Sequence, residues 1–163
     1  MKKQLLGLAA LAACLTLAAC GGSGQAESQP AAEEKQPTAA QVVEAVSAGL
    51  TFVDNMTTVE GDLFFDFYLL DPETVEDACM YTSGSRATAE EVTVIKMKEG
   101  EEISLAQEAA DQRVEDQRLA YENYIPEELT KIDGAVTYTH GQYLLLVVAD
   151  DPSPAEEAFE AQF

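Results

Sequence analysis

The spacing of apolar side chains divides the chain after residue 37 into helical and strand segments. Thr38 and Gln41 have the spacing of a capping box, in which each side chain accepts a hydrogen bond from the other residue's backbone N–H. A helix is therefore expected to begin at this point. Its apolar side would consist of Val42, Val43, Val46 and Leu50.

Segment 62–70 carries the densest group of aromatic residues, and acidic residues interrupt the apolar ones at helical intervals. This pattern predicts a short helix whose aromatic stripe is Phe64, Phe67 and Tyr68. Such a stripe can form a ligand-binding surface, but at this spacing it more often belongs to the core. Asp71 would end the helix, because the residue before a proline is disfavoured in the helical region.

Segments 75–83 and 92–98 are predicted to form two paired strands, separated by a break at Gly84. The second segment is rich in β-branched residues, which favour strands. Lys96 and Lys98 share one face of it, where they would either bind a phosphate or discourage association of strand edges. Cys79 is expected to be buried between the first strand and the next helix.

That helix is predicted over 101–124, because apolar residues recur there at intervals of three and four, and Pro126 would end it. The inner stripe would be Ile103, Ala106, Ala110, Val114, Tyr121 and Tyr124. We expect this amphipathic helix to lie across the sheet.

A β-hairpin is predicted over 135–148, with its turn at Gly141. In the second arm of the hairpin, both alternating sets of positions are apolar, so we expect a central strand that is covered on both faces. A terminal helix over 155–163 follows, with Ala158 and Phe159 facing inward. Residues 38–163 are therefore predicted to form a single α+β domain, with a four-stranded, mainly antiparallel sheet and helices packed on it.

The first 37 residues have the pattern of an export signal and a tether. Lys2 and Lys3 precede an apolar run, which ends in the lipobox Leu17-Ala18-Ala19-Cys20. The same tetrapeptide pattern ends at Cys14, but Cys14 is followed by more apolar residues, whereas a glycine-rich polar segment follows Cys20. We expect a lipoprotein signal peptide over 1–20, lipidation of Cys20, and a disordered tether over 21–37. The domain would then be held by a diacylglyceryl anchor on the extracytoplasmic face of the cell membrane.

The 163 residues include 30 acidic and 9 basic ones, which gives a formal net charge of −21. Removal of Lys2 and Lys3 with the signal would leave 7 basic residues against 30 acidic ones, a charge of −23. A surface of this kind repels nucleic acid, so we expect no nucleic-acid partner. Cys79 would be the one cysteine in the domain, so packing without a disulfide must stabilise the fold.

Several short motifs in a fixed order resemble a family of small acidic lipoproteins of Gram-positive bacteria that is described only as a domain of unknown function. Besides the lipobox and its Gly21-Gly22-Ser23-Gly24 segment, the motifs are Leu70-Asp71-Pro72-Glu73-Thr74-Val75-Glu76, Ala89-Glu90-Glu91-Val92, Tyr124-Ile125-Pro126-Glu127-Glu128 and Gly141-Gln142-Tyr143-Leu144. The resemblance covers residues 41–163. One departure is Tyr68-Leu69-Leu70, where members often have Tyr-Gly ahead of the Asp-Pro step. The resemblance implies a cell-surface lipoprotein and brings no catalytic residues.

The candidate chemistry is sparse. Cys79 and His140 form the one conventional pair of nucleophile and base, and each also has an ordinary structural role, in the core and at a hairpin turn respectively. The sequence shows no Cys/His cluster, calcium loop or glycine-rich phosphate loop, so we expect no metal and no cofactor. The favoured function is a non-enzymatic binding or accessory module of the cell envelope, with a protein or cell-wall partner. A small Cys/His hydrolase and a small-ligand-binding lipoprotein are the alternatives.

Overall fold

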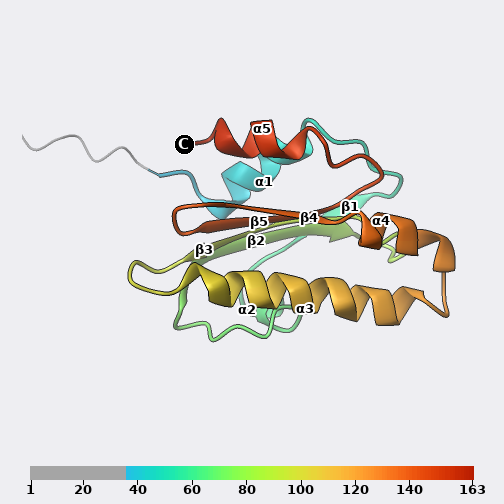
Figure 1. Ribbon diagram of the computed structural model, residues 1–163, viewed down its shortest axis with the longest axis horizontal. Helices are drawn as coiled ribbons and strands as arrows, with labels where there is room; N and C mark the ends of the chain where they lie inside the picture. Colours follow the sequence, from blue (N-terminus) through green and yellow to red (C-terminus); the bar gives the residue numbers. More distant parts are fainter. Residues whose placement is uncertain (1–35) are drawn as a thin grey trace, which may run out of the picture. The chain divides into compact units, whose positions relative to one another are not determined.

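A five-stranded antiparallel sheet forms the middle of the domain, in the strand order β1–β2–β3–β5–β4 (Figure 1). The computed structural model describes residues 36–163, so Cys14, Cys20 and most of the predicted tether lie outside the described residues. In chain order the elements are α1 (Ala39–Ser47), β1 (Met56–Val59), α2 (Asp62–Phe65), β2 (Val75–Ser83), β3 (Glu91–Met97), α3 (Ile103–Tyr121), the 3₁₀ turn η1 (Pro126–Glu128), α4 (Leu129–Asp133), β4 (Val136–His140), β5 (Tyr143–Val148) and α5 (Ala155–Glu160). The α+β class, the antiparallel sheet and the flanking helices are as predicted.

The sheet has five strands rather than the four predicted, because β1 was missed. This strand has four residues, and Thr57 and Thr58 in its middle are exposed at the edge of the sheet, so its sequence shows no alternation. Pairing with β2 holds it in place, with Met56 opposite Ser83 and Val59 opposite Met80. The strand therefore depends on a tertiary contact rather than on a local pattern.

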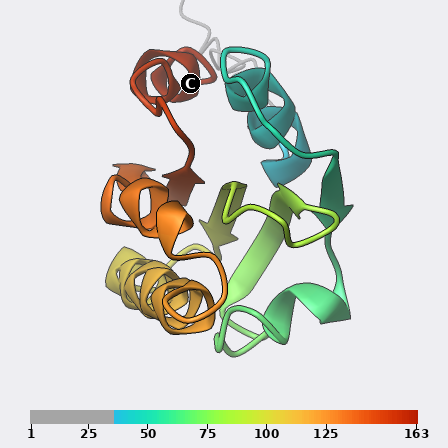
Figure 2. The same ribbon diagram turned by 90° about the vertical axis from the view of Figure 1, so that its right-hand side faces the viewer.

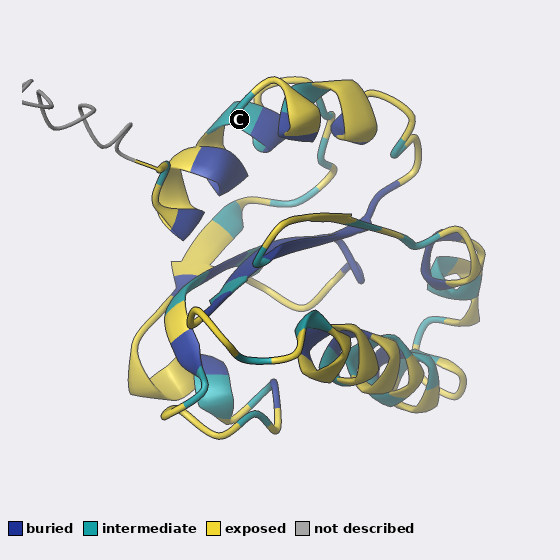
Figure 3. Cartoon of the chain, turned by 60° about the vertical axis from the view of Figure 1, so that its left-hand side comes forward, coloured by how far each residue is buried: buried dark blue, intermediate teal, exposed yellow. Residues whose placement is uncertain are grey.

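Helices cover both faces of the sheet, as two views at right angles show (Figures 1 and 2). One face packs against α1 and α5, with Val42, Val46 and Phe159 fully buried. The other face packs against α2, α3 and α4 and encloses Phe64 and Ile132. The inner strands β3 and β5 are the most deeply buried part of the sheet (Figure 3). Every residue of β5 is buried, which confirms the predicted central strand.

The N-terminal capping box of α1 is also confirmed. Thr38 Oγ1 accepts from the backbone N–H of Gln41 at 3.2 Å, and Gln41 Oε1 accepts from the backbone N–H of Thr38 at 2.9 Å.

Cys79 is buried as predicted but faces the layer of α1 and α5, not the long helix α3. Side chains alternate along a strand, so Cys79 and Met80 point to opposite faces, and Met80 takes the α3 side. Ala78-Cys79-Met80 is apolar in both parities, so the sequence could not show which residue faced which layer.

Three helices are shorter than predicted, one of them α5, which ends at Glu160 rather than at residue 163. Helix α2 ends at Phe65, and a turn beyond it brings Tyr68 into a stack on Phe64, with ring centroids 4.7 Å apart. Helix α3 ends at Tyr121, so Tyr124 lies beyond it and is exposed rather than part of the inner stripe. Within residues 36–163, no helix combines the length and the apolar character needed to cross a membrane.

Candidate functional site

The two residues proposed as a nucleophile and base, Cys79 and His140, are not brought together. Cys79 lies on β2 and His140 on β4, and β3 and β5 separate these strands. Three strand spacings of about 4.8 Å place the two strands roughly 14 Å apart. His140 Nδ1 instead lies 3.0 Å from Glu160 Oε2, and the imidazole ring stacks on Phe163. Burial raises the pKa of the Cys79 thiol to about 11, and the nearby carboxylates of Glu60 and Asp77 add to this.

Lys96 and Lys98 do not form a phosphate site either. The ammonium group of Lys96 lies 2.6 Å from Glu76 Oε1, and that of Lys98 donates to the backbone oxygen of Glu73 at 2.5 Å. Among residues 36–163, no group of three or more His, Cys, Asp or Glu side chains is arranged to hold a metal ion.

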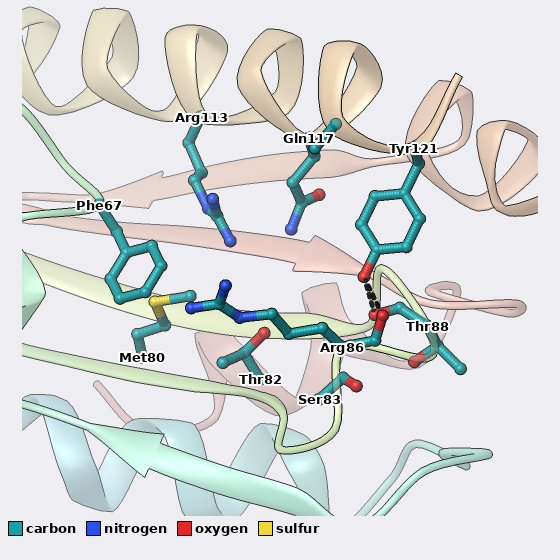
Figure 4. Close-up of a pocket in the computed structure, with 10 residues that line it drawn as sticks. Phe67, Met80, Thr82, Ser83, Arg86, Thr88, Arg113, Gln117 and Tyr121 are labelled. Atoms are coloured by element: carbon teal, nitrogen blue, oxygen red, sulfur yellow. Dashed lines mark hydrogen bonds between the residues drawn. The ribbon is translucent and has the colours of Figure 1, made fainter. Parts of the chain in front are cut away.

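A pocket of about 180 Å³ lies instead between α3 and the α3 side of β2 (Figure 4). Helix α3 contributes one wall, and β2 with the loop after it contributes the opposite one. The lining residues are Phe67, Met80, Thr82, Ser83, Arg86, Thr88, Arg113, Gln117, Ala120 and Tyr121. The pocket thus combines an apolar wall with two arginines and an amide.

The buried Glu91 carboxylate, on the first residue of β3, positions two of these side chains. Arg113 donates to Glu91 Oε2 from Nε at 3.0 Å and from Nη2 at 2.7 Å, and Gln117 Nε2 donates to the same oxygen at 2.9 Å. Glu91 Oε1 accepts from the Tyr68 hydroxyl at 2.6 Å and from Thr93 Oγ1 at 2.8 Å. Both carboxylate oxygens are therefore saturated by donors, and Glu91 acts as a fixed anchor for α3.

This network favours an ionic pair in the interior of the protein. Burial alone would lower the pKa of Arg113, but the Glu91 carboxylate beside it raises that pKa on balance. Burial and the same carboxylate raise the pKa of Tyr68 well above its ordinary range. Tyr68 therefore stays protonated and donates, and Arg113 stays a cation whose charge Glu91 balances.

The neighbouring Glu90 is also fully buried, and it holds the segment before β1 and the loop before β3 in place. Its carboxylate accepts from the backbone N–H of Val53 at 3.0 Å and of Asp54 at 3.2 Å, and from Thr88 Oγ1 at 2.9 Å. Lys131 Nζ lies 3.3 Å from it. Burial alone would raise the pKa of Glu90, but these hydrogen bonds and Lys131 lower it on balance.

Loop 84–88, at the mouth of the pocket, is held in place from both ends. Asp54 Oδ2 accepts from the hydroxyls of Ser83 at 2.5 Å and Ser85 at 2.6 Å. At the other end, the Tyr121 hydroxyl lies 2.5 Å from the backbone oxygen of Thr88 and 3.1 Å from that of Arg86 (Figure 4). Arg86 has a φ of +60°, which is uncommon for a residue other than glycine. The loop thereby holds Arg86 in a conformation that directs its side chain along the pocket.

Two polar groups in the pocket have no partner among residues 36–163. Arg86 takes part in none of the ion pairs of this part of the chain. Gln117 is only 3% exposed, yet its Oε1 accepts no hydrogen bond. Its Nε2 must face the acceptors Glu91 and Ala89, so the oxygen is turned away from them. Both residues line the pocket, Arg86 with an exposed cation and Gln117 with an oxygen that is buried away from solvent.

Sequence reasoning missed Arg113, Gln117, Glu90, Glu91 and Arg86. A signal for two of them was present: Arg113 and Gln117 continue the spacing of Ala106 and Ala110, so they are polar residues on the apolar side of α3. No comparable signal marks Arg86, because its role depends on the conformation of its loop.

The family model described as "Domain of unknown function (DUF4358)" matches residues 50–149. The chain belongs to this family. The match confirms the suspected membership in a family of unknown function. The matched segment of the DUF4358 domain contains all five strands and the whole pocket, whereas α1 and α5 lie outside it. Neither a curated protein nor a solved structure matches the chain.

Proposed function

We propose that the protein is a non-enzymatic binding module of the cell envelope, anchored in the membrane through Cys20, whose ligand occupies the pocket between α3 and β2. The Arg86 guanidinium, which lines the pocket and forms no ion pair within residues 36–163, carries this proposal. A polar group of a ligand could pair with this guanidinium, whereas the neighbouring Glu91 carboxylate is already saturated by donors.

The chemistry of the pocket favours binding over catalysis. Its charged side chains are arginines, which stay protonated and do not act as bases. Glu91, which lies next to them, is occupied by Arg113, Gln117 and Tyr68. The alternative of a Cys/His hydrolase receives no support from the separation of Cys79 and His140.

The size of the pocket favours part of a larger partner over a complete small-molecule ligand. Sites for drug-sized ligands usually measure about 300–1,000 Å³. A pocket of about 180 Å³ suits one amino-acid residue or the end of a chain. This supports a peptide, protein or cell-wall partner.

The anchor is tested by fractionating cells that produce single-cysteine variants. Cys20→Ala should release the protein into the medium or leave it uncleaved, because the lipid acceptor is lost. Cys14→Ala removes a cysteine from the same apolar segment and serves as the matched control, with membrane attachment unchanged. Loss of attachment in Cys14→Ala alone would contradict the choice of Cys20.

The pocket is tested by photocrosslinking on intact cells. A photoreactive amino acid at Ala120, which lines the pocket, should crosslink to a component of the envelope. The same amino acid at Gln112, an exposed position on α3 outside the lining of the pocket, is the control and should not. Equal crosslinking from both positions, or none from Ala120, would contradict the proposed site.

A further inference from the structure

We propose that the outer edge of β4 binds an extended, basic segment of a partner protein, which pairs with Thr137 and Thr139 and adds a strand to the five-stranded sheet. We call the outer side of Val136–His140 the β4 edge. None of these five residues lines the pocket between α3 and β2, so the β4 edge is a second surface, independent of the ligand site proposed above.

Two β4 residues direct their backbone groups away from the sheet. The N–H of Met97 on β3 donates to the backbone oxygen of Gln142, just before β5, at 2.8 Å. Backbone groups alternate in direction along a strand, so those of the next residue, Tyr143, face β4, and the β4 residue paired with Tyr143 faces back toward β5. One and three positions earlier, Thr139 and Thr137 therefore point outward. Their N–H and C=O groups face a side on which no further strand follows within residues 36–163.

The β4 edge lacks the features that commonly prevent pairing with another strand. Edge strands are often protected by a lysine, a proline or a β-bulge. The five residues of β4 are Val, Thr, Tyr, Thr and His, and they pair with β5 without a shift in register. Thr137, Thr139 and His140 are exposed, so the described part of the chain leaves this side of the strand open to solvent. An extended segment could therefore pair with β4 through main-chain hydrogen bonds.

The charge around the β4 edge selects a basic partner. Residues 132–163, which form β4, β5 and α5, contain six acidic residues and no lysine or arginine. The six acidic residues, all exposed, are Asp133, Asp150, Asp151, Glu156, Glu157 and Glu160. Cations of α3 and α4 pair with the first two, and His140 lies beside the last, whereas the other three form no ion pair within residues 36–163. Lysine or arginine side chains of a bound segment would thus meet unpaired carboxylates.

Helix α5 brings its acidic residues alongside the β4 edge. It follows β5 in the chain and ends at Glu160, whose Oε2 lies 3.0 Å from Nδ1 of His140 at the end of β4. The helix therefore runs over the β4–β5 hairpin, with Phe159 turned toward the sheet (Figure 1). A second copy of the chain would bring the same acidic residues to this edge, and like charges disfavour such pairing. The favoured occupant is therefore a segment of a different, basic protein.

The test is amide hydrogen exchange, measured by NMR on the full chain in a nonionic detergent. The probe is the basic peptide acetyl-Lys-Val-Lys-Val-Lys-Val-Lys-amide, and the peptide with Glu in place of every Lys is the acidic control. We expect the basic peptide to slow exchange of the Thr137 and Thr139 amides at least about tenfold, because both N–H groups become hydrogen-bonded. The acidic peptide should leave their exchange unchanged.

Variants at the two threonines separate strand pairing from attraction between charges. Thr137→Pro removes an outward N–H, and proline is tolerated on an edge strand, so the fold should persist while the peptide no longer protects Thr139. Thr137→Val keeps the N–H and should bind the peptide like wild type. Thr139→Lys leaves the backbone groups in place and should weaken binding at least about tenfold, because it adds a like charge.

Three results would overturn the inference: equal protection by both peptides, no protection by the basic peptide, or protection that Thr137→Pro and Thr139→Lys both leave unchanged. Protection that rises with protein concentration in the absence of peptide would show that a second copy occupies the edge instead. Crosslinking from Ala120 tests the pocket separately, so the β4 edge and the proposed function can fail independently of each other.

Discussion

At the scale of single residues, two adjacent buried carboxylates organise this domain. Glu90 and Glu91 are both inaccessible to solvent, and each is matched by a cation and by several N–H or O–H donors. Burying a carboxylate is tolerable only with such complete pairing. The two residues point to different partners: Glu91 fixes α3, and Glu90 fixes the segment before β1 and α4. Together they hold α3 and the loop at the mouth of the pocket in place.

The low pKa of Glu90 makes stability depend on pH. Its pKa in the folded protein lies below the ordinary value of 4.5, so its stabilising effect is complete above that value and is lost as the pH falls toward the folded pKa. Glu90→Gln should lower the free energy of unfolding by about 1–3 kcal/mol at pH 7, because backbone donors and Lys131 lose their acceptor. The difference from wild type should shrink as the pH falls below 4.5.

Denaturant unfolding at several pH values measures this difference. Glu127→Gln, on the exposed side of η1, removes the same charge and should run parallel to wild type. A difference for Glu90→Gln that stays constant or grows as the pH falls would refute the assigned role.

The Cys79 thiol should be nearly unreactive in the folded protein. Its pKa of about 11 leaves little thiolate at neutral pH, and its side chain is 2% exposed. In a chain with Cys14 and Cys20 replaced by Ser, maleimide should label Cys79 slowly in native buffer and rapidly in denaturant. Cys79→Ser should cost roughly 1–3 kcal/mol of stability, because a hydroxyl would enter an apolar site. Fast native labelling that His140→Ala slows would instead support the hydrolase alternative.

At the scale of elements, periodicity predicted the long and central parts and failed at the short and peripheral ones. Helix α3, β5 and the capping box of α1 were visible because packing or capping imposes a regular spacing of residue types. Strand β1 and the exact length of α2 were not, because pairing with β2 and the Phe64–Tyr68 stack determine them. The face predicted for Cys79 was wrong for a related reason. A run that is apolar at both odd and even positions does not indicate which side chains point to which layer of helices.

Gly84 lies where the end of β2 meets the start of β1, and it gives a prediction at the scale of elements. A Cβ at this position would lie 2.9 Å from the backbone oxygen of Asn55, while the Gly84 N–H donates to that same oxygen. Gly84→Ala should therefore displace the start of β1 and cost about 1–3 kcal/mol of stability. Gly49→Ala, where the nearest atom would lie at 3.6 Å, is the matched control and should be neutral or slightly stabilising.

Thermal unfolding and amide hydrogen exchange check this prediction. In Gly84→Ala, faster exchange should be confined mainly to Met56–Val59 and its partners on β2. Unchanged exchange in β1 would mean that the contact with Asn55 does not fix the edge strand.

At the scale of the whole molecule, the distribution of charge is the main functional clue. A strongly acidic chain places two arginines in the lining of a small pocket, inside the segment that the family model matches. Net charge could be read from the sequence, but this meeting of two arginines could not. It results from Arg86, which its loop directs along the pocket, and Arg113, which Glu91 aligns beside it from α3.

The most direct test of the account is to locate a bound ligand by intermolecular nuclear Overhauser effects. With N-acetyl-L-alanine, which has the form of the last residue of a peptide chain, bound to the full chain, the alanine methyl protons should show cross-peaks to the Met80 methyl group and the Phe67 ring, which belong to the lining of the pocket. Cross-peaks that arise only from exposed residues outside the pocket, such as Val53 or Leu105, would contradict the claim that this pocket is the ligand site.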